Sequence, residues 1–101
     1  MFDLSALTAK TGDEFAMFTA GSERVVVRGD KKSIILSEEE VKWMVAQGYK
    51  WSGHTHPGDD LNVLRSSPGD RTVLKAFNQR TSVIYNSVGE FKTFTHAERG
   101  D

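Results

Sequence analysis

Residues 37–57 read SEEEVKWMVAQGYKWSGHTHP, and this stretch decides the fold. Its first half predicts a helix, because the opening serine and the third glutamate have the spacing of a capping box and the apolar residues that follow recur at helical intervals. Gly48 stands where the cap at the end of that helix is expected. Residues 49–53 then predict a strand that leads straight into His54 and His56.

Shorter elements flank this centre on both sides. Asp3 is the expected cap of a first helix, and Asp70 is the expected cap of a last one. The further predicted elements are a helix over residues 3–10, strands over 14–20, 24–28, 33–36, 82–85 and 91–95, and a helix from Asp70 to about Gln79. Helices and strands are mixed and several strands are joined by short turns. We therefore predict an α+β domain, a mainly antiparallel sheet flanked by two or three helices.

Length and composition limit the classes of protein to consider. The 101 residues suit one domain over 1–101, and 13 basic against 14 acidic residues give no support to a nucleic-acid or membrane binder. No apolar stretch approaches the roughly 18 residues of a membrane span, and no signal-peptide core is seen. We expect a soluble protein, cytoplasmic or delivered as part of a larger exported protein. The chain has no cysteine, so a transition-metal site must use histidine and carboxylate ligands.

A metal site is predicted in the long loop after the central strand. His54 and His56 lie two residues apart, so their side chains point to the same side of an extended segment. Pro57 and Pro68, each followed by glycine, can fold the loop back and bring Asp70 to the histidines. Three protein ligands with one open position are the arrangement of a catalytic zinc. The alternative interpretation is a pair of partly exposed polar histidines.

Zinc hydrolysis also needs a carboxylate that can take a proton from water. Most candidates have a simpler role in helix capping, turns or loop solvation, whereas Glu14 heads a strand of bulky apolar residues, where a carboxylate is hardest to justify. On the residues alone, a catalytic and a structural role for Glu14 stay equally open. The carboxylates considered are Glu14, Glu23, residues 38–40, Asp59, Asp60 and Glu90.

The motif His-Thr-His-Pro at residues 54–57, with Ser-Pro-Gly-Asp at 67–70, resembles the signature of the JAB/MPN (JAMM) zinc metallopeptidases. That superfamily includes the proteasome-lid deubiquitinase, the bacterial RadC family and JAB-like domains of bacterial polymorphic toxins, and the short chain is most similar to the last of these. The resemblance covers residues 14–94. It implies an MPN-like fold, with His54, His56 and Asp70 as zinc ligands.

The resemblance also implies an activity. Glu14 would activate a zinc-bound water for amide hydrolysis, and Ser67 would steady the tetrahedral intermediate. The implied substrate is a peptide or a ubiquitin-like protein, and the toxin-associated branch implies a cognate immunity protein as a further partner. Thirteen residues separate His56 from Asp70, more than is usual in the family, which puts substrate preference in doubt. Ser66 beside Ser67 leaves an ambiguity of register.

Two other functions remain open. The chain could be a non-proteolytic MPN-fold binding module, although scaffold relatives in the family usually lose some of the three ligands, the base and the serine, all of which are present here. A RadC-like role in nucleic-acid processing is the third hypothesis, and no basic stripe supports it. We expect His96 to be a surface residue, and Trp43 and Trp51 to pack in the core or at its rim.

Overall fold

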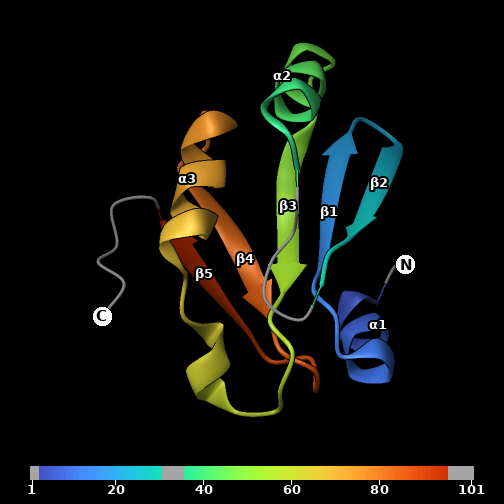
Figure 1. The fold of residues 1–101 in the computed structure, drawn as a ribbon, viewed down its shortest axis with the longest axis vertical. Helices are drawn as coiled ribbons and strands as arrows, with labels where there is room; N and C mark the ends of the chain where they lie inside the picture. Colours follow the sequence, from blue (N-terminus) through green and yellow to red (C-terminus); the bar gives the residue numbers. More distant parts are fainter. Residues whose placement is uncertain (1–2, 31–35, 96–101) are drawn as a thin grey trace.

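The computed structural model describes residues 3–30 and 36–95, and it shows helices on a five-stranded sheet (Figure 1). The α+β class predicted from the sequence is confirmed. The elements in chain order are α1 (Leu4–Thr11), β1 (Phe15–Ala20), β2 (Glu23–Arg28), α2 (Glu38–Ala46), β3 (Lys50–Thr55), the 3₁₀ helix η1 (Leu61–Leu64), α3 (Pro68–Ala76), β4 (Thr81–Tyr85) and β5 (Phe91–Thr95).

The sheet is mixed, and its strand order is β2-β1-β3-β4-β5. β1 pairs with β2 and β3 in antiparallel fashion, and β4 pairs with β5 in the same way, but β3 and β4 run parallel. A parallel pair needs a crossover connection, and η1 with α3 supplies it. The loop after the histidines and the last helix therefore form one connection between two central strands.

Helix α2 begins and ends as its sequence predicts. The Ser37 hydroxyl accepts a hydrogen bond from the Glu40 N–H at 3.1 Å, and the Glu40 carboxylate accepts one from the Ser37 N–H at 3.0 Å. This reciprocal pair is a capping box. At the other end Gly48 has a φ of 85°, the left-handed conformation that glycine adopts without strain. The chain turns there and enters β3.

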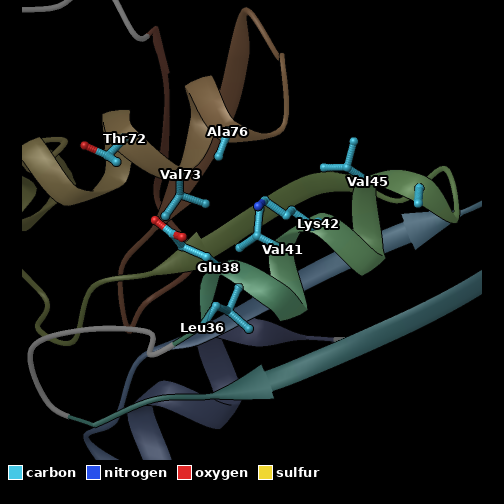
Figure 2. Close-up of a pocket in the computed structure, with 9 residues that line it drawn as sticks. Leu36, Glu38, Val41, Lys42, Val45, Thr72, Val73 and Ala76 are labelled. Carbon is cyan, nitrogen blue, oxygen red and sulfur yellow. The ribbon is translucent and has the colours of Figure 1, made fainter.

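One hydrophobic core lies between the sheet and the pair α2 and α3. Trp51 is buried in it, as predicted, whereas Trp43 is 56% exposed and stacks on Tyr49 at a ring-centroid distance of 6.1 Å. An apolar groove of about 690 Å³ remains open between α2 and α3 (Figure 2). The buried residues of the core are Ala16, Phe18, Met44, Tyr49, Trp51, Leu64, Leu74, Phe77, Ile84 and Phe94.

Some boundaries differ from the prediction. The last helix begins at Pro68 with Ser67 as its cap, so the prediction that Asp70 caps it is wrong. Proline suits the first helical position because it has no N–H to leave unpaired there. The predicted strand over 33–36 falls almost wholly outside the described residues, and His96 lies outside them too. Among the described helices, none is long and apolar enough to cross a membrane.

We predict that Gly53→Ala destabilises the sheet. A Cβ on Gly53 would lie 3.0 Å from the Tyr85 ring and 3.3 Å from the Val83 carbonyl oxygen, so the ring and the backbone of β4 would have to shift by a few tenths of an ångström. The expected loss is about 1–3 kcal/mol in the free energy of unfolding, measured by urea denaturation. The control is Gly69→Ala in α3, where the nearest atom is 3.7 Å away. Equal stability of both variants would contradict the prediction.

Candidate metal centre

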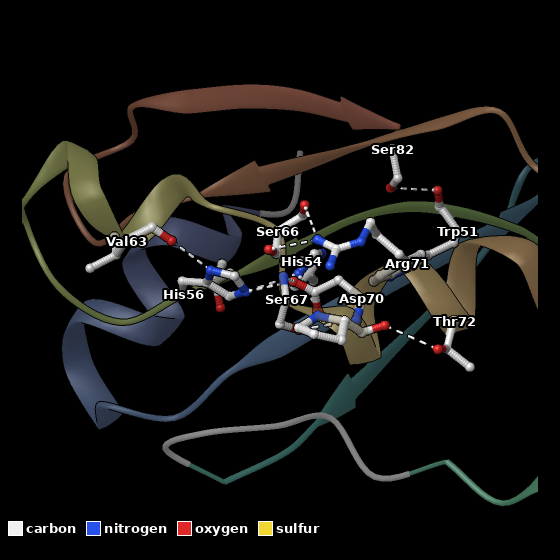
Figure 3. Close-up of polar contacts among 12 residues, drawn as sticks. Trp51, His54, His56, Val63, Ser66, Ser67, Asp70, Arg71, Thr72 and Ser82 are labelled. Atoms are coloured by element: carbon white, nitrogen blue, oxygen red, sulfur yellow. Dashed lines mark hydrogen bonds and ion pairs between the residues drawn. The ribbon is translucent and has the colours of Figure 1, made fainter. Parts of the chain in front are cut away.

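Three of the predicted site residues meet at one point between β3 and α3 (Figure 3). The Nε2 atoms of His54 and His56 lie 3.1 Å apart. The Asp70 carboxylate faces both rings, with one oxygen 3.1 Å from the Nε2 of His54 and the other 3.1 Å from the Nε2 of His56. The structure thus brings together the residues that the sequence indicated as a metal site.

Strand β3 places both histidines. His54 is inside the strand, opposite Ala16 of β1 and beside Ile84 of β4, and it is fully buried. His56 continues the extended backbone, since its N–H donates to the Tyr85 carbonyl at 2.9 Å. The two-residue alternation of an extended chain therefore sends both rings to one side.

Helix α3 places the carboxylate. Asp70 is the third helical residue, where it completes a capping box with Ser67. Its carboxylate accepts a hydrogen bond from the Ser67 N–H at 2.9 Å, and its own N–H donates to the Ser67 hydroxyl at 3.0 Å. Both the capping contact and the histidine contact fix the orientation of the same carboxylate. Asp70 thus gains its direction from the start of α3, although it is not the cap.

The ring nitrogens of the two histidines have different partners. The Nδ1 of His56 lies 2.5 Å from the Val63 carbonyl oxygen. A carbonyl only accepts, so Nδ1 must carry the hydrogen and a neutral His56 presents a lone pair at Nε2. His54 stacks on Trp51 at 4.6 Å, and its Nδ1 has no hydrogen-bond partner among the described residues. Aromatic contacts, not hydrogen bonds, hold the outer side of that ring.

Burial and charge act on the titration of all three groups. Burial lowers the pKa of His54. Burial also opposes the charging of His56, but the hydrogen bond and charge of Asp70 outweigh it and raise the pKa of that ring. Burial opposes ionisation of Asp70 too, yet the contacts to both imidazoles hold the pKa of its carboxyl far below its usual range. Asp70 is therefore an anion at neutral pH.

The donor set fits a small divalent cation. Atoms bound at about 2.0–2.1 Å around a tetrahedral ion lie about 3.3–3.4 Å from one another, close to the separations found here. Two imidazole nitrogens and a carboxylate oxygen are ligands that zinc accepts. At least one lone pair, that of His56, faces the anionic Asp70, an arrangement that a cation or a proton must stabilise.

Glu14 lies next to this centre, immediately before β1. Continuing the pairing of Ala16 with His54 by two residues sets Glu14 opposite His56. The side chain is only 6% exposed, and burial raises its pKa to about 7, with the charge of His56 acting against the rise and that of Asp70 adding to it. A buried carboxyl that titrates near neutrality suits a group that takes up and releases a proton.

Ser67 is exposed beside Asp70, and its oxygen accepts from the Asp70 N–H, which leaves the hydroxyl hydrogen available for donation. Ser66, the other serine of the ambiguous register, is buried and accepts from Arg71. Ser67 is therefore the serine that accompanies the ligands.

Most of the other carboxylates considered have structural partners. Glu23 accepts a hydrogen bond from Tyr49, and Glu90 accepts one from Asn86. Glu40 belongs to the capping box of α2, and Asp60 caps η1. These contacts give simple reasons for their presence, and they favour Glu14 among the candidates for a base.

Comparison with known proteins identifies no relative: no family model, no curated protein and no solved structure matches the chain. The interpretation of the site accordingly stands on the residues themselves. One contributor was missed in the sequence, the Val63 carbonyl that binds His56. A backbone carbonyl leaves no trace in the residue type, so no sequence signal could have identified it.

We predict that Glu14→Gln alters stability in a pH-dependent way in the metal-free protein. The fold raises the pKa of Glu14 from 4.5 to about 7, so its neutral form is favoured on folding. The wild type therefore loses stability as pH rises between those values, whereas glutamine stays neutral. Relative to the wild type, the variant should gain about 1–3 kcal/mol between pH 4.5 and pH 8, measured by urea denaturation.

The control for this experiment is Glu39→Gln, which removes an exposed carboxylate from the first turn of α2. Its side chain stays exposed on folding, so the gain that burial of Glu14 predicts for Glu14→Gln should be absent. A similar pH trend in both variants would contradict the burial argument for Glu14.

Proposed function

We propose that this domain is a zinc-dependent peptidase or isopeptidase of the JAMM type. The observation that carries the proposal is the convergence of His54, His56 and Asp70, whose ligand atoms approach one another to 3.1 Å. The buried Glu14, immediately before β1, adds the carboxylate that hydrolysis requires. A metal-binding cluster with a neighbouring titratable carboxyl is the expected composition of a metallohydrolase site.

The five residues have distinct roles in this proposal. Zinc held by His54, His56 and Asp70 would polarise a substrate carbonyl and make water more acidic. Glu14 takes a proton from water and passes it to the departing amine, and a pKa near 7 allows both steps. Ser67 donates its hydroxyl hydrogen to the oxyanion that develops on the substrate, a contact of a kind worth about 3–4 kcal/mol.

The resemblance of the motif to the JAMM signature supports the more specific part of the proposal, that the fold is MPN-like. The same resemblance suggests a peptide or a ubiquitin-like protein as substrate. It also suggests that the domain acts in a bacterial toxin and is covered by an immunity protein. The order of the elements, from Glu14 through the β1–β2 hairpin and α2 to β3, agrees with this proposal.

The proposed function predicts stoichiometric zinc binding. Elemental analysis of the purified protein should find about one zinc per chain, because the cluster offers one set of three donors. His56→Ala removes one donor and should abolish the bound zinc. Asp70→Asn removes the charge but retains an oxygen for the Ser67 N–H, so helix α3 should persist while zinc is lost. A folded wild-type protein that refuses added zinc would refute the enzyme proposal.

The proposed function also predicts that Glu14 is needed for peptide-bond cleavage. Glu14→Gln should retain zinc and lower peptide-bond cleavage by about 10²–10⁴-fold, because a positioned base contributes this much. The measurement is single-turnover cleavage of a peptide library, followed by mass spectrometry. Glu39→Gln, far from the ligands in sequence and exposed on α2, is the matched control and should cleave like the wild type. Equal activity of the two variants would exclude Glu14 as the base.

A second candidate function is a binding module that performs no proteolysis. The apolar groove between α2 and α3 favours it, since Val41, Val45 and Val73 line an open surface there (Figure 2). The same Glu14→Gln variant separates the two functions, because a module would keep its partner affinity while an enzyme loses turnover. Within residues 3–30 and 36–95, no comparable feature favours a role in nucleic-acid processing.

A further inference from the structure

The two predicted histidine ligands are held by different means. Val63, in the loop after β3, accepts the hydrogen of the His56 Nδ1 at 2.5 Å. His54 has only ring contacts on its outer side, with Trp51 at 4.6 Å and Phe94 at 5.6 Å. The orientation of His56, and the choice of the nitrogen that faces Asp70, thus depend on where η1 places the Val63 carbonyl.

Three contacts fix the position of η1. Leu64 is 5% exposed and belongs to the hydrophobic core. The Asp60 carboxylate accepts a hydrogen bond from the Asn62 N–H at 2.9 Å, which caps the short helix. Val63 packs so closely over Gly58 that a Cβ at Gly58 would lie 3.0 Å from a Val63 methyl group. Residues 59–62 are exposed, but Gly58 and Val63 are in close contact, so we expect a shift of Gly58 to displace Val63.

Ser87 ties Gly58 to the turn between β4 and β5. The Gly58 N–H donates to the Ser87 hydroxyl at 2.9 Å, and the Ser87 N–H donates to the Gly58 carbonyl at 2.8 Å. The turn is itself held by the fully buried Asn86, whose side-chain oxygen accepts from the N–H groups of Val88 and Glu90. A continuous set of hydrogen bonds and contacts therefore connects the β4–β5 turn with His56.

We propose that Ser87 is a positioning residue for the metal centre. It anchors Gly58, keeps Val63 in place as the acceptor for the His56 Nδ1, and so holds the Nε2 lone pair toward Asp70. The inference rests on the proposed function in that the ion is taken to be zinc. Ser87 lies 31 positions after His56 in the sequence and itself offers no atom to the ion.

The test is Ser87→Ala, measured first as the zinc dissociation constant in competition with a chromophoric chelator. Loss of an outer contact of this kind weakens metal binding by about 10–100-fold, and that weakening is the expected result. The matched control is Ser52→Ala in β3, which likewise removes one serine side-chain hydrogen bond, the 2.7 Å contact with Thr19. This control should bind zinc like the wild type, and Ser87→Thr should restore most of the affinity.

A second readout uses the metal-free protein. At a pH high enough for His56 to be neutral, imidazole ¹⁵N NMR should show its single hydrogen on Nδ1 in the wild type and a mixture of tautomers in Ser87→Ala. Wild-type zinc affinity together with an unchanged tautomer in Ser87→Ala would overturn the inference. If the wild type binds no zinc, the proposed function fails, and the tautomer measurement alone still decides the role of Ser87.

Discussion

The contact of one carboxylate with two imidazoles joins helix α3 to the end of strand β3. Asp70 belongs to the first turn of α3, and the histidines belong to the end of β3. The helix is itself fixed because Leu74 and Phe77 are buried in the core. Packing of α3 on the sheet therefore determines where the third donor lies, and the capping box with Ser67 determines which way it points.

The electrostatics of the site move the pKa values of two neighbouring carboxyl groups in opposite directions. Asp70 contacts both imidazoles and stays ionised, whereas Glu14 is buried with less compensation and has its pKa raised to about 7. Two carboxyls with pKa values moved in opposite directions can take different roles, one as a permanent anion and one as a proton carrier. Burial of the Glu14 carboxyl destabilises its charged form, and a role as a proton carrier would explain why a carboxyl is buried there.

Much of this arrangement could be predicted from the sequence. The capping box at Ser37, the glycine turn at Gly48 and the strand into the histidines follow from local residue preferences, and those predictions are confirmed. The predicted cap of α3, Asp70, lies three residues too late, because Ser67 is the cap and Asp70 completes the capping box with it. Local residue preferences identify the helix but not its first residue.

Other features could not be predicted because they depend on contacts between distant segments. The parallel pairing of β3 with β4 arises from the crossover through α3, and no periodicity in either strand specifies it. The partner of the His56 Nδ1 is a backbone carbonyl, and any residue type at Val63 could provide one. Sequence patterns therefore identify the three side chains that meet at the site but not the backbone atom that orients one of them.

The long connection between His56 and Asp70 illustrates this limit. In the sequence its 13 residues suggest a lengthened loop that would bear on substrate preference. In the structure, part of the connection forms η1, which Leu64 anchors in the core and whose Val63 carbonyl binds His56. A shorter connection would have to find another acceptor for that ring nitrogen, since a histidine ligand needs its second nitrogen oriented. The length of the connection is thus tied to the orientation of His56, through the position of the Val63 carbonyl.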